Sequence, residues 1–453
     1  MNKLILLALL MLGSLAQAQT SPAISSWLQN TTQTGNYYPK GNATLTPNSI
    51  LVNCQKVEYS ADYVYVTATG IPAYPTGPFS DGNPSNAEDQ SGIYQIPLNP
   101  TENTGTKDAT VGGNIGIFIN GVALFDYRDG VAWNPQTNEL CGGPGRDRCP
   151  GARGTVQAWN RDAIPAEKEG FDCAKGHPAN GNYHHHQNPS AFKLDLEVVS
   201  EICNLYDAEG LYAIDSNEHS PLIGYAYDGF PIYGAYSYAK KDGTGGIARI
   251  KSGYQLRDIT TRSTHADGST VDSGPDVDAT YWLGYFREDY GYIASTDEDV
   301  LDEHNGRFCI TPEYPEGTYA YFCTVDENWN SAYPYAVGPT FHGNYTNRKT
   351  TSVGEATKVY TASTNRVDVL TGTHITVFPN PTSDLLAIQL GGLTRADVKI
   401  TLIDMAGREI STTTIPQGST IAYYDVQTVY EGTYFLRFED GVSTLTKKIS
   451  ITR

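Results

Sequence analysis

Histidines gather in one short stretch of this 453-residue chain. Four of its nine histidines, His177, His184, His185 and His186, lie within ten residues. If 183–186 forms a β-strand, His184 and His186 point to one face and His185 to the other. A Pro-Ala-Asn-Gly turn after His177 would fold His177 back onto the first face. Because three neutral imidazoles suit copper or zinc, His177, His184 and His186 are the expected metal ligands. A packed cluster bonded to carbonyl groups is the structural alternative.

Two other side chains are weaker candidates for the same metal. Asp228 lies in Asp-Gly-Phe-Pro, which predicts a tight turn between apolar strands. A carboxylate in a turn most often caps backbone N–H groups, and metal ligation or general-base catalysis are its alternatives. His304 lies in Asp-Glu-His-Asn, where an additional ligand could arise. A calcium site is a lesser expectation, because the acidic residues miss the EF-hand spacing. These residues are Asp272, Asp276, Asp278, Asp297 and Asp299.

The elements that must position these side chains have the composition of a β protein. Residues 115–125 are nearly continuously apolar with Asn-Gly inside, which predicts a buried hairpin. Residues 165–170 predict one helical turn. Residues 190–203 predict a short helix or a short strand. With 45 glycines and 25 prolines, the chain favours turn-rich β-structure over a helical bundle. We therefore expect one large β-rich region over 19–345.

A weak internal sequence repeat suggests that the fold contains two similar units. The pattern Asp172, Gly176 and Tyr183 returns as Asp302, Gly306 and Tyr319. In the second copy, the positions of the three consecutive histidines hold other residues, so it cannot bind a metal in the same way. They are Ala320, Tyr321 and Phe322. Hairpin chemistry shared without common descent is the alternative reading.

The net charge excludes some classes of partner, and the first residues of the chain predict export. Lys and Arg total 31 against 50 Asp and Glu, a net charge of −19, and no basic cluster is present. This excludes a nucleic-acid binder and a binder of anionic membranes. Residues 1–18 combine Lys3, an apolar run and Ala-Gln-Ala, the features of a signal peptide read by the Sec machinery. We expect no membrane span after its removal.

The seven cysteines fit an oxidising compartment. One pair brackets a glycine-rich loop, another flanks a predicted hairpin, and no CxxC motif suggests redox chemistry. The candidate disulfides are Cys141–Cys149, Cys173–Cys203 and Cys309–Cys323, with Cys54 left over. The spacings do not fit a zinc cluster, and the sequence leaves the connectivity open.

The last part of the chain differs from the rest in composition and in its pattern of apolar residues. Residues 346–374 are rich in Thr and Ser and predict a linker. Residues 375–453 alternate short strands and turns, which predicts a small Ig-like β-sandwich. Its motifs resemble the C-terminal sorting domain of the type IX secretion system (type A). That resemblance implies passage through the type IX translocon and a secreted or outer cell-surface location. The residues that carry it include Pro379, Asn380, Pro381, Gly407, Lys447 and Lys448.

The region 114–343 resembles the YHYH domain family. The resemblance rests on Gly176-His177-Pro178, on Tyr183 through His186, and on blocks at 224–234, 301–307 and 333–335. The family's Tyr-His-Tyr-His is Tyr-His-His-His here, and the exchange at His185 lies on the face away from the expected ligands. The family implies no settled activity.

Two classes of function remain open. The first is an exported metal-binding domain, acting as an oxidase, a hydrolase or a metal-capture protein. The second is a non-catalytic adhesion or glycan-binding domain, whose 32 tyrosines could stack on surface sugars. The sequence holds no Gly-x-Ser-x-Gly, His-Glu-x-x-His or P-loop motif and therefore names no reaction.

Overall fold

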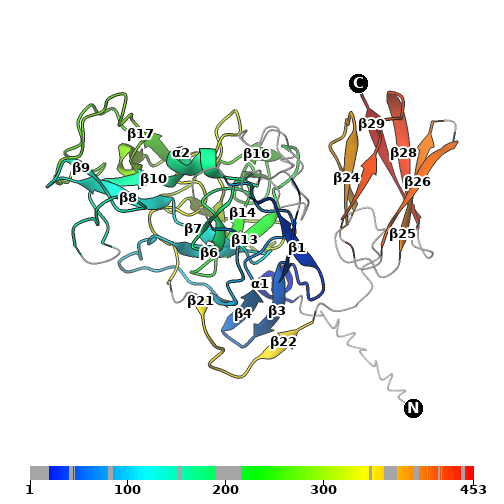
Figure 1. Ribbon diagram of the computed structural model, residues 1–453, viewed down its shortest axis with the longest axis horizontal. Coiled ribbons are helices and arrows are strands. Elements are labelled where there is room, and N and C mark those ends of the chain that lie inside the picture. The colour runs from blue at the N-terminus through cyan, green and yellow to red at the C-terminus, as the bar shows by residue number, and fades with distance from the viewer. Residues whose placement is uncertain are drawn as a thin grey trace, which may run out of the picture.

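The computed structural model of the chain is mostly β, as the composition predicts (Figure 1). One apolar core draws on residues from 23 to 341, and a second on residues from 375 to 451. In the part of the chain described below, no helix is long and apolar enough to cross a membrane. The described residues are 20–39, 44, 46–79, 85–151, 155–172, 174–189, 216–345, 349–361, 375–390, 397–405, 407–416, 419, 421–439 and 444–453. The expected signal peptide, the segment 190–203 and the Cys173–Cys203 pair lie outside them.

An eight-stranded sheet forms the centre of the large region. The predicted hairpin at 115–125 is confirmed as its β6–β7 pair. In spatial order the strands are β11 (His177–Ala179), β12 (Asn182–His185), β7 (Ala123–Phe125), β6 (Asn114–Phe118), β13 (Leu222–Ala226), β14 (Pro231–Tyr233), β20 (Thr318–Phe322) and β19 (Gly306–Cys309). Only the β12–β7 and β14–β20 pairs are parallel. From either edge towards the central β6–β13 pair, the strand pairings therefore follow the same order: antiparallel, parallel, antiparallel.

The two halves of this sheet are built alike. Each hairpin at the centre turns through an Asx-Gly pair, and Gly121 and Gly229 have φ of 80° and 93°. The side chain before each glycine accepts a bond from the N–H two residues on, at 3.1 Å for Asn120 and 3.3 Å for Asp228. A positive φ is what glycine adopts without strain, so both turns need it. The paired architecture suggested by the sequence is therefore present in the fold.

The same correspondence extends to the outer hairpins. Tyr183 donates its hydroxyl to both carboxylate oxygens of Asp172, at 3.0 and 2.8 Å. Tyr319 does the same with Asp302, at 2.9 and 3.0 Å. Each Asp also accepts the backbone N–H of the glycine four residues on. The repeated sequence pattern thus corresponds to one structural unit that occurs twice.

A five-stranded sheet packs against the same core, and it corrects one sequence prediction. Its order is β21 (Lys349–Thr350), β5 (Gly92–Pro97), β4 (Tyr63–Ala68), β3 (Cys54–Tyr59) and β22 (Lys358–Tyr360). Part of the predicted linker 346–374 therefore supplies both edge strands. These edge strands are only two and three residues long and expose Lys349, Lys358 and Val359, so they gave no alternating apolar signal.

An insertion between β7 and β11 forms a three-stranded sheet and a short helix. Its elements are β8 (Arg128–Asn134), β9 (Glu139–Cys141), β10 (Asn160–Asp162), α2 (Ala163–Glu167) and the 3₁₀ turn Lys168–Gly170. The predicted helical turn is confirmed. The Asp162 carboxylate begins α2 by accepting the N–H of Ile164 at 3.0 Å. Asp162 also accepts the hydroxyl of Tyr335 at 2.7 Å, which fixes the start of the helix to the core.

The remaining elements of the large region are small. They are α1 (Pro22–Ser25), the sheet of β1 (Thr34–Tyr37) and β2 (Thr46–Leu51), the sheet of β15 (Tyr236–Tyr238) and β16 (Ile247–Arg249), the sheet of β17 (Tyr254–Leu256) and β18 (Tyr290–Tyr292), and the 3₁₀ turn Arg287–Asp289.

The cysteines confirm one predicted disulfide and correct another. Cys141 and Cys149 are bonded across the glycine-rich loop. Cys54 is a buried thiol, as predicted, and so are Cys309 and Cys323, which were expected to form a disulfide. Cys309 lies opposite Thr318 in the β19–β20 pair, so Cys323 is five residues further along the neighbouring strand. Five residues span about 17 Å, far beyond the reach of a disulfide.

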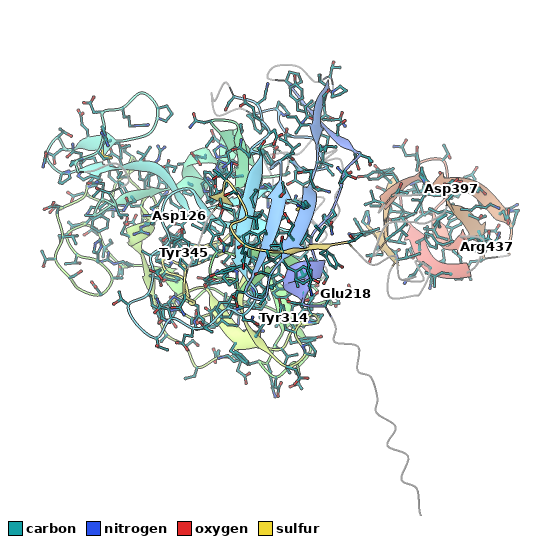
Figure 2. The ribbon with its side chains drawn as sticks, turned by 90° about the horizontal axis from the view of Figure 1, so that it is seen from below. Asp126, Glu218, Tyr314, Tyr345, Asp397 and Arg437 are labelled. Atoms are coloured by element: carbon teal, nitrogen blue, oxygen red, sulfur yellow. A yellow bond between two sulfur atoms is a disulfide. The ribbon has the colours of Figure 1, made fainter. Side chains whose placement is uncertain are left out.

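The C-terminal region is a sandwich of two sheets around its own core. One sheet orders β23 (Ile375–Phe378), β24 (Leu385–Leu390) and β27 (Ile421–Asp425), and the other β26 (Glu409–Ile415), β25 (Val398–Asp404), β28 (Gly432–Glu439) and β29 (Thr444–Ile451). Figure 2 labels Asp397 and Arg437 in this sandwich. The Asn380 amide connects its first turn to its last strand, donating to Lys448 O at 3.2 Å and accepting from Ser450 N at 2.7 Å.

Candidate metal centre

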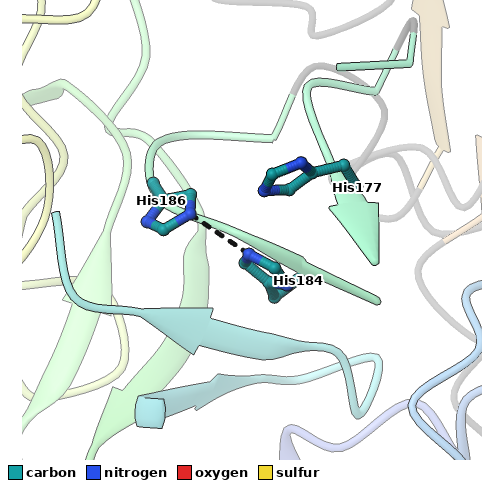
Figure 3. A group of neighbouring side chains, drawn as sticks. All are labelled: His177, His184 and His186. Atoms are coloured by element: carbon teal, nitrogen blue, oxygen red, sulfur yellow. Dashed lines mark hydrogen bonds between the residues drawn. The ribbon is translucent and has the colours of Figure 1, made fainter. Parts of the chain in front are cut away.

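The β11–β12 hairpin brings the three predicted ligands together. His177 lies directly opposite His184 in the register. The connecting residues Asn180 and Gly181 have φ of 50° and 83°, the conformation of a tight hairpin turn. His177, His184 and His186 can each offer a ligand atom within 4.8 Å of the others. Figure 3 shows the three rings turned towards one another.

Backbone carbonyls determine which ring nitrogens of the cluster carry hydrogen. His184 Nδ1 lies 2.9 Å from Asn182 O, and His186 Nδ1 lies 2.5 Å from Asp126 O. A carbonyl oxygen only accepts, so both Nδ1 atoms donate, and each ring in its neutral form presents a lone pair on Nε2. These two Nε2 atoms are 3.1 Å apart. A hydrogen shared between the two nitrogens, or a metal ion bound by both, accounts for this approach.

Glu167, at the end of α2, lies beside the three histidines, and the sequence analysis did not identify it. Its Oε2 atom lies 3.3 Å from Nε2 of His177 and 3.3 Å from Nε2 of His186. Burial acts to raise the pKa of this carboxyl, but the two neighbouring imidazoles outweigh it and lower the pKa to about 2. The cluster therefore contains a carboxylate. A single glutamate ten residues before His177 follows no motif, and only the predicted helical turn marked its position.

Aromatic rings hold the imidazoles in place. Phe125 stacks on His184 with ring centroids 3.7 Å apart, and Phe171 packs edge-on against His177 at 4.8 Å. The three histidines are only 1–5% exposed. Burial, together with the neighbouring imidazoles, lowers the pKa of His184 well below its usual value. At neutral pH this ring is therefore an uncharged donor that suits a metal.

His185 points to the opposite face, as the strand alternation predicts. Its Nε2 lies 2.8 Å from the hydroxyl of Tyr74, and its Nδ1 lies 3.0 Å from Lys175 O. Burial lowers its pKa to about 3. His185 is thus a satisfied core residue that takes no part in the cluster.

The two weaker candidates lie elsewhere, in the second half of the sheet. Asp228 accepts from the Tyr321 hydroxyl at 2.5 Å and from Gly343 N at 2.9 Å, in addition to its bond within the turn. This is the capping role of a turn carboxylate. His304 Nδ1 lies 2.7 Å from Thr340 Oγ1. Among the described residues, neither belongs to a metal-ligating group, and neither do the acidic residues considered for calcium.

The second half replaces the cluster with a structural arrangement. Arg307 stands at the position of His177, and Ala320 and Phe322 stand at those of His184 and His186. The Arg307 guanidinium donates to Tyr238 O at 2.6 Å and to Ser237 Oγ at 3.1 Å. An arginine cannot ligate a cation, so the histidine cluster has no functional counterpart there.

Both regions of the chain match known protein families. Residues 376–452 match the secretion system C-terminal sorting domain. The protein is therefore secreted or held at the outer cell surface, with the type IX secretion system as its partner. No curated protein shows significant similarity to the chain. Residues 93–334, more than half of the chain, match the YHYH protein family. The chain belongs to the YHYH protein family.

Proposed function

We propose that this exported protein holds one transition-metal ion at His177, His184 and His186. The observation that supports this most strongly is the 3.1 Å approach of His184 Nε2 and His186 Nε2. Both Nδ1 atoms donate to carbonyls, so each ring in its neutral form has its lone pair on Nε2, directed at the other ring. Copper and zinc are the metals that such a nitrogen-rich site favours.

A metal ion fits the cluster better than a proton. Burial and the neighbouring imidazoles disfavour the protonated form of His184. The adjacent Glu167 carboxylate brings a negative charge into the same buried space, where an uncompensated charge is costly. A divalent cation compensates the carboxylate and both lone pairs together.

Glycan binding gains no support from the structure. Many tyrosines whose number suggested stacking on sugars lie in the protein core, where no sugar can reach them. Among them are Tyr74, Tyr94, Tyr127, Tyr183, Tyr225, Tyr227, Tyr233 and Tyr321. The adhesion alternative therefore remains a sequence prediction, and the metal site is the function that the geometry favours.

Elemental analysis of the mature protein, purified without a tag or added metal, tests the proposal. We expect about one transition-metal ion per chain, and none in the His184→Ala/His186→Ala double variant. His265→Ala is the matched control, because its ring packs against Trp159 outside the cluster. Absence of metal from the wild-type protein after reconstitution with copper and zinc would overturn the proposal. So would equal metal content in the double variant.

A further inference from the structure

We infer that Glu167 is the fourth ligand of this metal and that four protein donors close its coordination sphere. The ion then pins helix α2 to the β11–β12 hairpin and leaves no position for a substrate. This inference rests on the proposed function and assigns the metal a structural role within it.

Three of the distances between these donor atoms match those within a single coordination sphere. A tetrahedral zinc site with bonds of 2.0–2.1 Å places its donors about 3.3 Å apart. His184 Nε2 and His186 Nε2 are 3.1 Å apart, and Glu167 Oε2 is 3.3 Å from two of the imidazoles. A carboxylate that contacted the metal only through a bound water would lie about 2.8 Å, one hydrogen-bond length, further from the metal than a direct ligand. Glu167 is therefore at the distance of a ligand.

Burial closes the remaining side of the site. The side chains of His177 and His186 are 6% and 2% exposed, and that of Glu167 is 22% exposed. Glu167 Oε2 itself is buried, and in the described part of the structure it accepts no hydrogen bond. A buried carboxylate oxygen without a donor costs free energy unless a cation takes the donor's place. The nearest polar atoms to this oxygen are Nε2 of His177 and Nε2 of His186, each at 3.3 Å, so an ion bound by these two nitrogens would also reach the carboxylate.

The ligands come from segments that are held separately. Helix α2 is fixed at its start by Asp162, which caps Ile164 and accepts the Tyr335 hydroxyl. The hairpin is fixed by its own register and by the packing of Phe125 on His184. An ion shared by Glu167 and the three histidines joins the insertion to the eight-stranded sheet. Zinc sites with four protein ligands have this structural role, whereas catalytic sites keep one position open.

Cobalt substitution of the mature, full-length chain tests the inference. Co²⁺ in a closed four-coordinate site absorbs strongly in the visible range, and added azide or imidazole should leave the wild-type spectrum unchanged. We expect Glu167→Gln, which keeps the shape of the side chain, to weaken zinc affinity at least about 100-fold, since losing even an outer-shell partner costs 10–100-fold. In this variant, added azide should change the cobalt spectrum. Glu169→Ala is the matched control, because Glu169 is exposed two residues further on.

The outcomes separate the two proposals. If wild-type cobalt protein binds azide, or if Glu167→Gln keeps wild-type affinity, the closed site is wrong while the three-histidine metal site stands. If the wild-type protein binds no metal at all, both proposals are overturned. Thermal unfolding adds a readout independent of spectra: zinc should raise the Tm of the wild type and of Glu169→Ala, but much less that of Glu167→Gln.

Discussion

The two halves of the eight-stranded sheet share a backbone plan and differ in the side chains at one end. Both turn through an Asx-Gly pair, and both anchor a loop by a tyrosine hydroxyl on an aspartate. In the first half the outer hairpin presents imidazoles, whereas in the second Arg307 bonds to backbone carbonyls. The comparison shows that the same scaffold forms with and without the histidine cluster. A few positions on a repeated hairpin decide whether it carries the side chains that we propose bind a metal.

The turn glycines offer the largest effects that would test this equivalence. A Cβ added at Gly121 would lie 2.6 Å from Ala68 Cβ, and one at Gly229 would lie 2.9 Å from Pro97 O. Left-handed strain and overpacking together predict that Gly121→Ala and Gly229→Ala each lose about 2–4 kcal/mol of unfolding free energy. Urea denaturation measures the loss. Gly130→Ala is the control, since its φ is 79° with nothing within 4 Å, and strain alone predicts about 1–2 kcal/mol.

The tyrosine–aspartate pairs should behave alike in the two halves. Tyr183→Phe and Tyr319→Phe each remove a hydroxyl that donates to both oxygens of a carboxylate. Because hydrogen bonds to charged groups contribute about 1.5–3 kcal/mol, we expect each variant to lose an amount in that range. The same denaturation measurement applies. A loss confined to one half would mean that the two loops, although alike in geometry, are not equivalent in energy.

At neutral pH the smallest effect belongs to a group in the second half that acts only in acid. His219 packs on Tyr233 and Phe322, and burial lowers its pKa to about 4. Its unfolded pKa is near 6.5, so its contribution is fully present above pH 6.5 and is lost as the pH falls towards 4. This single group adds a slope of up to about 1.4 kcal/mol per pH unit in that window. His219→Gln should flatten the pH dependence of unfolding there, and an unchanged slope would contradict this role.

Much of the fold followed from local patterns. The apolar run with Asn-Gly at its centre predicted the β6–β7 hairpin, and alternation placed His184 and His185 on opposite faces. The repeated Asp, Gly and Tyr pattern predicted the paired halves, because each residue has a fixed part in the loop. These features depend on contacts between residues close in the sequence.

The features that sequence analysis missed depend on tertiary structure. Glu167 joins the histidines only because α2 packs beside the hairpin, and no spacing rule connects it to His177. Cys309 and Cys323 flank a hairpin, but the register places Cys309 opposite Thr318. Asp228 caps backbone N–H groups, as the turn predicted, but its further partners Tyr321 and Gly343 lie far away in the sequence and could not be predicted.

The strands β21 and β22 have a consequence for how the mature protein behaves outside the cell. They lie at opposite edges of the five-stranded sheet and pair with β5 and β3. Uncovered, those two inner strands would present open N–H and C=O groups, the template on which chains stack edge to edge. Residues 349–360 thus pair with both of these edges. We expect a chain cut at residue 345 to aggregate more readily, because it loses both strands, whereas a chain cut after residue 361 keeps them.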